Sequence, residues 1–580
     1  MSDQRELAAQ FDQLAALMEI TGANGFRVSA ARRVARVLQE FDGDLRELAE
    51  TPGGLEAMDG IGKGSAERIR QWCRTGRLEG RDRIAAEVPD GLIGLLDISG
   101  LGPKTVGRLW REAGVTDTAT LREAINDGRL ASLPRMGAKT IANISDSLDF
   151  AAKAAQRTSI GAALPLATQL CAALASVPGT TRIDWAGSLR RGCETIGDID
   201  LLAISGDPTC LIAAFTTQPG VTKVLAAGDT KASVRLNDQI QIDLRVVPEQ
   251  EFGAAWLYFT GSKEHNVALR HRAQQRNLRL NEYGLFPDDG EESPPQDRGK
   301  RPIASQTEQD IYEALELPWR PPELRESRDG ITEPPPDLIT VEDICRDLHT
   351  HTTASDGHLS IRDMAEEAIR RGFDSLAITD HSRSSVQANG LDADRLRSHI
   401  EAIREVDASL PEITLLAGSE VDIHADGRLD YDDEILAMLD IVVASPHAAL
   451  KQSPDDATAR LIEAASHPLV HIIGHPTGRM IGRRPGLEPD MRALCAAAAA
   501  HGTALEINAN PKRLDLCDRH VRIALECGGL ISINTDAHQA GHFDFLRYGV
   551  LTGRRGTLTA EACINAWPLS RLLEWLDRGS

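Results

Sequence analysis

The chain has 580 residues, too many for one hydrophobic core, so several domains of roughly 100–200 residues are expected. Its content of 42% hydrophobic and 26% charged residues is typical of globular proteins. The net charge of −22, taken alone, argues against a polyanionic partner, although carboxylate-rich metal sites also make a chain acidic. Nine cysteines without a Cys-x-x-Cys pair argue against disulfide staples and thiolate zinc sites.

The N-terminal sequence MSDQRE is charged, and no apolar signal core follows it. No apolar stretch approaches the ~18–20 residues that a membrane helix needs. We therefore expect a reduced, cytoplasmic, monomeric protein that makes no membrane contact.

Residues 1–150 are typical of short amphipathic helices joined by glycine-rich turns, and the turns at 58–64, 98–105 and 133–140 resemble one another. A Gly-x-Gly turn before a helix admits a phosphate, because glycine has no Cβ and the helix N-terminus offers free N–H groups. A single turn of this kind is equally consistent with a plain loop, and in the third copy Arg135 stands where a glycine would be. The repetition predicts salt-sensitive phosphate-backbone binding by Gly60, Gly62, Lys63, Gly100, Gly102, Lys104, Gly137 and Lys139.

The segment 187–200, GSLRRGCETIGDID, is the most informative stretch of the chain. Asp198 and Asp200 are two residues apart, so on an extended segment both project to the same side. The apolar run 201–204 that follows indicates a buried strand. Carboxylates that share Mg²⁺ or Mn²⁺ beside small residues and arginines are what nucleotidyl transfer requires. The alternative is that the acids are solvated and that Arg190-Arg191 forms a salt-bridged face.

Residues 250–320 are typical of a small α+β piece, with a polar loop at 287–302. Three consecutive prolines within 328–338 predict a stiff linker, because proline fixes φ. From residue 341 onward short apolar runs alternate with helical patterns, which predicts a β/α barrel or a layered α/β domain. These runs lie at 376–378, 441–443, 471–473, 504–507 and 530–533.

Fourteen of the 16 histidines lie after residue 336, which indicates metal chemistry different from that of the aspartate pair. His349 and His351 are two apart and would point the same way on a strand. Other candidates end apolar runs, and the strand ends of a β/α barrel form one mouth. A lone buried histidine is usually a core residue, but so many after apolar runs favour a shared metal cluster. The candidate ligands are His349, His351, Asp356, His381, Glu420, His447, His475, Asp536 and His538.

The segment 187–200 gives residues 1–320 a clear resemblance to the family X DNA polymerases, the repair-polymerase group. Asp243, in 241–247, matches the third metal carboxylate of that family, and 258–262 matches its nucleotide-pocket segment. The resemblance implies that Asp198 and Asp200 bridge two divalent ions and that Asp243 binds the ion that activates the primer 3′-hydroxyl.

The resemblance also implies a pocket for a deoxynucleoside triphosphate, formed by Gly187, Ser188, Arg191, Gly197, Tyr258, Phe259, Gly261, Asn266 and Arg270. Ser188 and Arg191 would hold the triphosphate, and Tyr258 with Phe259 would exclude a 2′-hydroxyl. Asn266 and Arg270 would lie against the minor groove and the template. Phe259 is also consistent with a core aromatic residue, and Lys231 with either a DNA contact or a solvated lysine.

One position departs from the family pattern. Members that cleave 5′-deoxyribose phosphate use a Schiff-base lysine after the first hairpin, and alignment on Gly60-Ile61-Gly62 places Arg68 there. Arginine stays protonated and forms no imine, so little lyase activity is expected.

Residues 343–575 resemble the polymerase-and-histidinol-phosphatase (PHP) domain, and all nine ligand positions of that family are filled. The resemblance implies about three Mn²⁺ or Zn²⁺ ions and phosphoester hydrolysis by a metal-bound hydroxide. We expect no ligand role for His358, His399, His424, His467, His471, His501, His520 and His542.

The predicted fold class is multidomain α+β and α/β, with helical N-terminal domains and a C-terminal distorted β/α barrel. The expected parts are two helix-hairpin-helix domains, a nucleotidyltransferase palm, a nucleotide-selecting α+β domain, a linker and the PHP domain. We place them at 1–85, 86–155, 156–250, 251–325, 326–342 and 343–575.

The predicted function is gap-filling DNA polymerisation in repair, coupled to a 3′–5′ exonuclease that also opens abasic sites or removes 3′ phosphates. The expected partners are gapped or primer-template DNA and deoxynucleoside triphosphates, and DNA would bring the protein to the nucleoid. Two alternatives stay open: a nucleotidyltransferase for RNA or a small molecule with a structural PHP domain, and a non-catalytic DNA-end-binding scaffold.

Overall fold

The computed structural model describes residues 3–41, 45–58, 60–97, 101–133, 136–137, 140–141, 144–145, 148, 157–237, 239–327, 330–481 and 486–577. The chain forms two compact units, Met1–Gln156 and Arg157–Ser580. Among the helices in the described ranges, none is both long and apolar enough to cross a bilayer.

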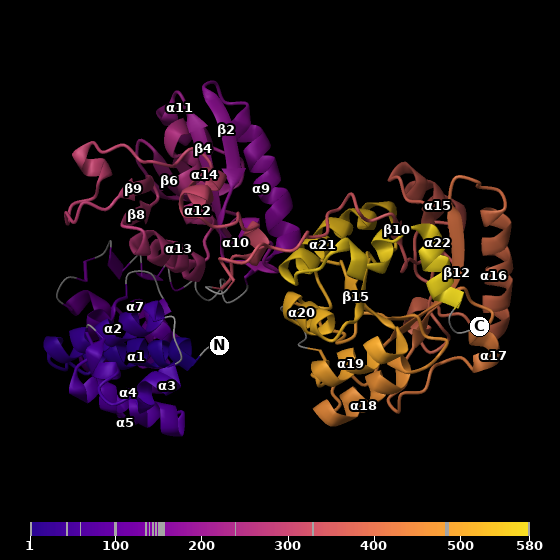
Figure 1. The fold of residues 1–580 in the computed structure, drawn as a ribbon, viewed down its shortest axis with the longest axis horizontal. Helices are drawn as coiled ribbons and strands as arrows, with labels where there is room; N and C mark the ends of the chain where they lie inside the picture. Colours follow the sequence, from indigo (N-terminus) through magenta and orange to yellow (C-terminus); the bar gives the residue numbers. More distant parts are fainter. Residues whose placement is uncertain are drawn as a thin grey trace. The chain divides into compact units, whose positions relative to one another are not determined.

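The first unit is helical (Figure 1). In α4 the buried residues Ala66, Ile69 and Trp72 recur every three positions and so form one apolar face. Two hydrophobic clusters fill the unit, and α1 contributes to both of them. The helices are α1 (Asp3–Ile20), α2 (Gly25–Glu40), α3 (Leu45–Glu50), α4 (Lys63–Thr75), α5 (Glu79–Ala85), α6 (Pro103–Ala113) and α7 (Thr118–Asn126).

The second unit begins with a five-stranded sheet in the order β2-β4-β7-β6-β5. The central strands β4 and β7 run parallel, so the strand that contains Asp243 lies directly beside the strand that contains Asp198 and Asp200. The strands of this region are β1 (Thr158–Ser159), β2 (Thr180–Trp185), β3 (Thr195–Ile196), β4 (Asp198–Ser205), β5 (Val221–Ala227), β6 (Lys231–Leu236) and β7 (Ile240–Val246). The helices are α9 (Ile160–Ala175), α10 (Gly187–Arg190) and α11 (Pro208–Thr216).

A small α+β segment follows the sheet, as expected from the sequence. It contains α12 (Phe252–Thr260), α13 (Lys263–Gln275), β8 (Leu278–Asn281), β9 (Gly284–Pro287) and α14 (Glu308–Ala314). Its own apolar cluster includes Leu257, Leu269, Leu285, Ile311 and Tyr312.

The C-terminal part contains a seven-stranded parallel sheet whose strands follow one another in sequence order. A parallel bridge between Thr350 and Ala537 joins the segments beyond the first and last strands, so the sheet is barrel-like and nearly closed at that end. The expected distorted β/α barrel is confirmed. The strands are β10 (Arg346–Asp347), β11 (Ser375–Ile378), β12 (Thr414–Asp422), β13 (Ile441–Ser445), β14 (Ile472–Ile473), β15 (Ala504–Asn508) and β16 (Leu530–Asn534).

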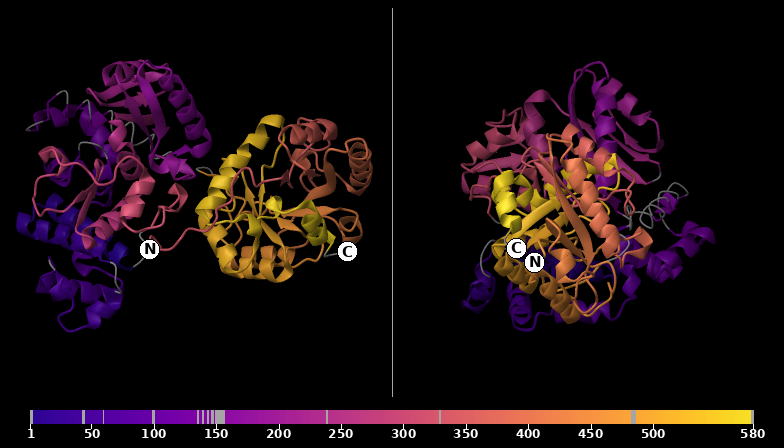
Figure 2. Two further views of the ribbon diagram at one scale, coloured as in Figure 1. Left: turned by 45° about the horizontal axis from the view of Figure 1, so that its top comes forward. Right: turned by 90° about the vertical axis from the view of Figure 1, so that its right-hand side faces the viewer.

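Helices surround these strands, as the orange-to-yellow elements in the left view of Figure 2 show. They are α15 (Ile361–Arg370), α16 (Ala393–Asp407), α17 (Asp433–Leu436), α18 (Pro454–Ala465), α19 (Met491–His501), α20 (Asp518–Glu526), α21 (Leu546–Arg555) and α22 (Leu569–Leu576).

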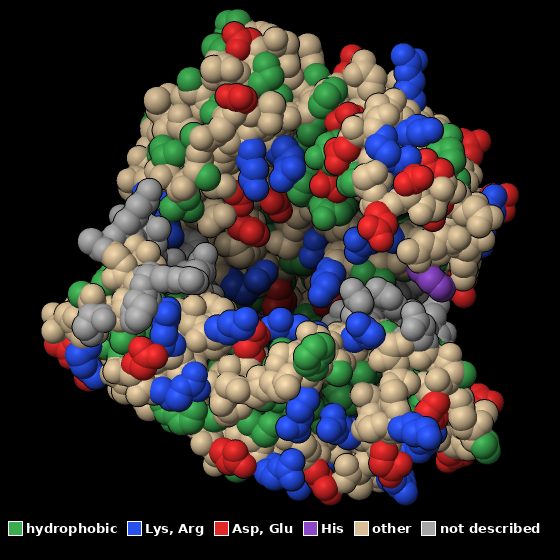
Figure 3. Space-filling view, turned by 90° about the vertical axis from the view of Figure 1, so that its left-hand side faces the viewer, with side chains coloured by type: hydrophobic (Ala, Val, Ile, Leu, Met, Phe, Trp, Pro, Cys, Tyr) green, Lys and Arg blue, Asp and Glu red, His purple; other side chains and the backbone are tan. Residues whose placement is uncertain are grey.

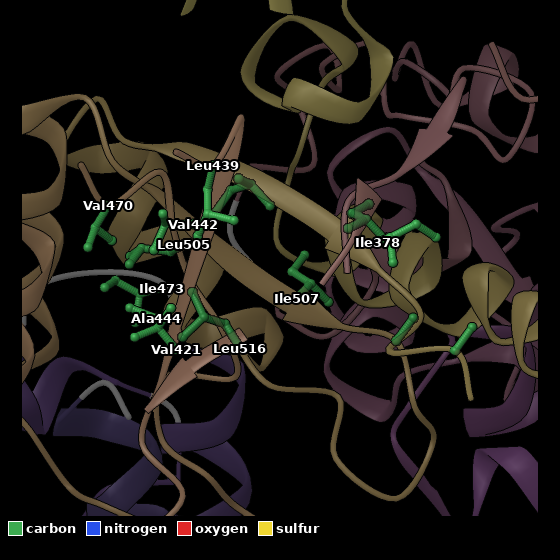
Figure 4. Close-up of a cluster of buried hydrophobic side chains, with 14 of the residues drawn as sticks. Ile378, Val421, Leu439, Val442, Ala444, Val470, Ile473, Leu505, Ile507 and Leu516 are labelled. Atoms are coloured by element: carbon green, nitrogen blue, oxygen red, sulfur yellow. The ribbon is translucent and has the colours of Figure 1, made fainter. Parts of the chain in front are cut away.

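The barrel strands are buried on both faces. On β13, Val442 and Ala444 belong to the cluster between sheet and helices (Figure 4), whereas Ile441 and Val443 belong to a second cluster that includes Leu572 and Leu576 of α22. This alternation is what a strand covered on both sides requires. The polar residues at the strand ends are therefore held by a rigid apolar frame.

Candidate active sites

The three aspartates of the predicted polymerase site lie on adjacent strands. Asp200 of β4 pairs in register with Asp243 of β7, and Asp198 is two residues before Asp200 on the same face. Asp243 accepts hydrogen bonds from Ser233 Oγ and, at 2.9 Å, from Gln241 Nε2. The strand pairing therefore brings together the carboxylates that the sequence analysis selected.

Burial and mutual repulsion raise the pKa values of two of these aspartates. Burial, together with Asp198 and Asp243, raises the pKa of Asp200 to about 7. The loss of water and the neighbouring Asp243 also raise the pKa of Asp198. A divalent cation relieves this repulsion, so the arrangement suits a hard metal ion with oxygen ligands.

Gly187 explains why the motif needs a glycine beside the aspartates. Its φ is +63°, and a Cβ atom there would lie 2.3 Å from Oδ2 of Asp200. Any side chain would therefore collide with the carboxylate and strain the backbone. The glycine lets the N-terminal end of α10 approach the carboxylate.

A cavity of about 390 Å³ opens beside Asp198 and Asp200. Its remaining lining comes from the α10 segment and from α12 and α13. Ser262, the last residue of the predicted segment 258–262, and Lys263, which follows it, also line the cavity, although neither was among the predicted pocket residues. The other lining residues are Gly187, Ser188, Arg191, Tyr258, Phe259, Gly261, Asn266 and Arg270.

Hydrogen bonds and ring contacts fix the predicted sugar-selecting segment. Asn266 Nδ2 donates to the carbonyl oxygen of Tyr258 at 2.7 Å, and the rings of Tyr258 and Phe259 meet edge to face at 5.1 Å. Phe259 also packs against a buried cluster, and the Arg245 guanidinium lies 4.4 Å from its ring centroid. Phe259 thus belongs to both the cavity wall and the core.

The two arginines of the motif have different surroundings. Arg190 makes a two-pronged ion pair with the buried Glu308, at 2.6 and 2.9 Å, and stacks on Trp256. Arg191 lines the cavity, and its Nη1 donates to the carbonyl oxygen of Thr260 at 2.5 Å. Arg190 is therefore structural, whereas Arg191 faces the space that a ligand would occupy.

The remaining predicted residues of this part lie elsewhere. Gly197 precedes β4 and does not line the cavity, and Lys231 is exposed at the start of β6. In the first unit, Gly62 caps α4 and Gly102 caps α6, while Lys63 and Lys104 are exposed in the first turns of these helices. The other hairpin positions are Gly60 and Gly137, which are described, and Gly100 and Lys139, which lie outside the described residues.

The surface is locally less acidic than the net charge implies. On the face in Figure 3, lysine and arginine side chains lie exposed among the acidic ones. A net charge of −22 therefore does not exclude a polyanionic partner.

The nine predicted ligands of the C-terminal part gather at the carboxyl end of the barrel. Eight of them form three overlapping groups whose ligand atoms all lie within 4.8 Å of one another. His351 and His381 are each shared between two groups. The ninth, His475, lies with Nε2 2.9 Å from Oε1 of Glu420. The groups are His351, Asp356, His381 and His538; His349, His351 and Asp536; and His381, Glu420 and His447.

Several ligand atoms in this cluster lack a partner that a protein core would normally provide. Within the described part of the chain, both ring nitrogens of His351, Nε2 of His349 and Nδ1 of His381 and His475 are buried without a hydrogen bond. Oε2 of Glu420 is in the same state. Buried polar atoms are normally satisfied, so this accumulation of unsatisfied ring nitrogens and a carboxylate oxygen fits a site for metal ions.

The pKa values of residues in the cluster also indicate that it favours bound cations. Burial raises the pKa of Glu420, but His447, His349 and His381 outweigh it and hold that pKa well below its usual range. Burial lowers the pKa of His447, yet Glu420 and Asp422 outweigh it and raise that pKa to about 10. Positive charge stabilises the carboxylates here, and metal ions would supply it in place of protons.

Backbone geometry at two ligands is strained. His475 has φ of +26° and Asp536 has φ of +56°, in the region that residues other than glycine rarely adopt. Such strain persists where the surrounding structure holds a functional side chain in place.

Carboxylates behind the ligands escaped the sequence analysis. Glu506 of β15 accepts from Nδ1 of His349 and from the backbone N–H of His475, at 2.8 and 2.7 Å. Asp422 of β12 accepts from Nδ1 of His447 at 2.8 Å. These bonds fix the tautomer and ring orientation of the ligands. A charged residue inside an apolar run, as in Leu505-Glu506-Ile507, is the signal that could have revealed them.

The eight histidines not expected to be ligands lie outside the three compact groups found among the described residues. The buried pair among them has other partners: Nε2 of His399 contacts Asp380 at 2.8 Å, and Nε2 of His471 contacts the carbonyl oxygen of Leu576 at 3.0 Å.

Comparison with known proteins accounts for both halves. The chain is 37% identical over 578 residues to the DNA polymerase/3′-5′ exonuclease PolX of Bacillus subtilis (strain 168), with 99% of each chain covered. The chain belongs to the PolX family of family X DNA polymerases. Family comparisons match a helix-hairpin-helix domain at 2–78, a SAM-like helix-hairpin-helix tandem at 92–149, a DNA polymerase beta thumb at 255–326 and a PHP domain at 347–510.

The chain also has shorter relatives, which match only a part of it. It is 32% identical over 205 residues to a probable phosphatase of Syntrophotalea carbinolica, covering 33% of this chain and 80% of the relative. It is 28% identical over 242 residues to a probable phosphatase of Edwardsiella ictaluri, covering 40% and 94%.

Proposed function

We propose that the chain is a DNA polymerase that fills short gaps during repair and that its C-terminal domain is a metal-dependent 3′–5′ exonuclease. The observation that carries the proposal is that one chain holds two unlike ligand sets, three aspartates beside a cavity and a histidine-rich cluster at a barrel mouth. The relation to PolX along 99% of the chain supports the pairing of both activities.

In the polymerase site Asp198, Asp200 and Asp243 would hold two Mg²⁺ or Mn²⁺ ions, which supply charge neutralisation for phosphoryl transfer. Ser188 and Arg191 would bind the triphosphate, and Tyr258 with Phe259 would exclude the 2′-hydroxyl. Asn266 and Arg270 would face the nascent base pair. Ser233 and Gln241 support this reading, because they hold the Asp243 carboxylate in place.

In the C-terminal site the nine ligands would hold about three Mn²⁺ or Zn²⁺ ions, which supply a nucleophile for phosphoester hydrolysis. The mixed nitrogen and oxygen donors favour these metals over Mg²⁺ and Ca²⁺. Glu506 and Asp422 would hold the imidazoles in the orientation that the ions need.

We assign the domains at 1–85, 86–155, 156–250, 251–325, 326–342 and 343–575. The hairpin helices of the first two would grip gapped or primer-template DNA through its phosphates, and DNA would bring the protein to the nucleoid. We propose that it acts as a cytoplasmic monomer.

Primer extension and primer degradation should be separable by mutation. The double variant Asp198→Ala with Asp200→Ala should lose extension on gapped DNA and retain Mn²⁺-dependent shortening of the primer. The double variant His349→Ala with His351→Ala should do the opposite. Loss of both activities from either variant, in protein that is folded by circular dichroism, would refute two independent sites.

A second reaction at the C-terminal site is removal of 3′ phosphates, which its similarity to probable phosphatases favours. A primer with a 3′-phosphate should become extendable after incubation with the protein. The His349→Ala with His351→Ala variant should leave the same primer blocked.

A further inference from the structure

The polymerase motif is in contact with the C-terminal domain. Leu551 of α21 packs on Gly192, where a Cβ atom would lie 3.3 Å from Leu551 Cβ and where φ is +67°. Leu514 and Tyr548, both almost fully buried, belong to the hydrophobic cluster of the palm. The loop that follows Arg191 therefore rests on the barrel domain.

A chain of charged side chains runs along this contact. Nε and Nη2 of Arg555, at the end of α21, bind Oδ2 of Asp518 at 3.0 and 2.8 Å within the barrel domain. Nη1 of Arg555 also donates to Oε1 of Glu326, at the start of the linker, and to the carbonyl oxygen of Arg191 in the palm, both at 2.9 Å. Arg555 thus binds the side chain of a linker residue and the backbone of a palm residue.

Glu326 links Arg555 to Arg191, which lines the cavity. Its Oε1 accepts from Nε of Arg191 at 2.9 Å, and Cys193 Sγ lies 3.1 Å away. Burial raises the pKa of Glu326, but Arg191 and Arg555 outweigh it and bring that pKa to about 2, so the carboxylate is ionised at neutral pH. The group between the two arginines is therefore a permanent anion.

The guanidinium of Arg191 is held from behind. Glu326 engages its Nε, the carbonyl oxygen of Thr260 engages its Nη1, and the side chain is only 14% exposed. A guanidinium has five N–H donors, so these two bonds fix its plane and leave donors for an anion in the cavity. A fixed guanidinium loses less conformational entropy when it binds a phosphate.

We propose that Arg555 of the C-terminal domain is a positioning residue of the polymerase site, acting through Glu326 on the triphosphate-binding Arg191. This inference rests on the proposed polymerase function. It makes nucleotide affinity depend on the barrel domain, although no described residue of the barrel lines the cavity.

The test is single-nucleotide gap filling in Mg²⁺, with KM for the nucleotide and kcat measured separately. A His351→Ala background removes degradation of the primer. Arg555→Ala and Glu326→Gln should each raise KM roughly tenfold, as expected for one lost charged hydrogen bond, and change kcat little. Arg555→Lys keeps the positive charge and should restore most of the affinity.

Two comparisons separate positioning from general damage. Arg554→Ala is the matched control, because Arg554 lies on the same helix and pairs with Glu323 at 2.7 Å, away from Arg191; its KM should stay within about twofold of the parent. In an Arg191→Ala background, Arg555→Ala should cause no further rise in KM, because its route to the nucleotide is gone.

An unchanged KM in both Arg555→Ala and Glu326→Gln, with normal extension by the parent protein, would overturn the inference and leave the proposed function intact. An equal rise in KM for Arg554→Ala, or a further rise in the Arg191→Ala background, would also overturn it. Absence of extension by the parent protein would instead overturn the proposed function and this inference with it. Glu326→Gln, which preserves shape, gives the result if Arg555→Ala does not fold.

Discussion

Asp200 is the ionisable group that tells most about how the palm works. Without a cation its pKa is about 7, well above that of an ordinary aspartate, because burial and two other carboxylates oppose its charge. The folded palm thus carries an unfavourable charge at neutral pH, and a bound metal removes the penalty.

Asp200→Asn should therefore stabilise the metal-free protein. Between about pH 4 and about pH 7 the folded state holds a proton that the unfolded chain has lost, so stability falls as the pH rises through that window. In a chelator at about pH 7.5 the variant should melt a few degrees above the parent, and the gap should narrow toward about pH 6. In excess Mg²⁺ the order should reverse, and the parent should melt above the variant. A variant that melts below the parent in chelator at every pH would contradict this account.

Arg68 allows a test of the expectation that the protein has little 5′-deoxyribose phosphate lyase activity. Because its guanidinium forms no imine, borohydride treatment of the protein on DNA with an incised abasic site should trap almost no covalent adduct. The variant Arg68→Lys is the matched comparison, and a gain of adduct would show that only the amine was absent. Efficient trapping by the unaltered protein would disprove the prediction.

At this scale the sequence was informative where ligands sit in short motifs. Asp198 and Asp200 could be selected because two residues of an extended strand face the same way, and His349 with His351 by the same argument. Glu506, Glu326 and Arg555 could not, because their roles arise only when distant segments meet. Of these three residues only Glu506 has a local sequence signal, because it is a lone charged residue within an apolar run.

Helices α4 and α6 begin in the same way. Each begins after a Gly-x-Gly turn and places an exposed lysine in its first turn, where free N–H groups and the helix dipole favour phosphate. The two helices are therefore the expected grip on the DNA backbone.

Lys63→Ala and Lys104→Ala should each weaken binding to gapped DNA without regard to its sequence. Each should also reduce the slope of log affinity against log salt by about 1, since one phosphate contact is lost. Fluorescence anisotropy over a salt series measures this, with Lys451→Ala, an exposed lysine of the C-terminal domain, as control. An unchanged slope in both hairpin variants would exclude these lysines from the DNA contact.

Strand positions in the barrel were largely predictable, because buried parallel strands are continuous apolar runs. Residues 376–378, 441–443, 504–507 and 530–533 all lie in strands of the sheet. The nine residues of β12 were not recognised as one strand, because Gly418, Ser419 and Glu420 interrupt its apolar run. Glu420 is one of the predicted ligands, so the strand was hardest to recognise where a ligand lies.

At the scale of the whole molecule, the palm and the barrel domain share a hydrophobic interface. Tyr548 of α21 is 3% exposed within the cluster of the palm, more than 300 residues away in sequence from most of its neighbours. Leu546 and Val550 of α21 belong to the barrel cluster, whereas Tyr548 belongs to the palm cluster. No local pattern predicts this contact, because an apolar residue off the barrel-facing stripe does not show which distant segment covers it. The sequence predicted separate domains but gave no indication that the palm and the barrel domain pack against each other.

Tyr548→Ala should destabilise the palm and the barrel domain together, by about 3 kcal/mol, because it leaves a cavity in their common interface. Phe543→Ala, in the core of the barrel domain alone, is the comparison. Limited proteolysis should release the barrel domain more readily from the Tyr548 variant than from the Phe543 variant. Equal release would mean that the interface does not hold the two parts together.

Arg190, Glu308 and Arg325 form an ion triad, which has a consequence for nucleotide selection. Glu308 is bonded both to Arg190, beside the catalytic motif, and to the fully buried Arg325, so one carboxylate ties the palm to the α+β segment. Parting these elements would leave charges in a dry interior without partners, which is far costlier than moving exposed loops. We therefore expect the binding pocket for the incoming nucleotide to be preformed. Nucleotide selection should then depend on how well the nucleotide fits this pocket, and not on a domain closure that follows binding.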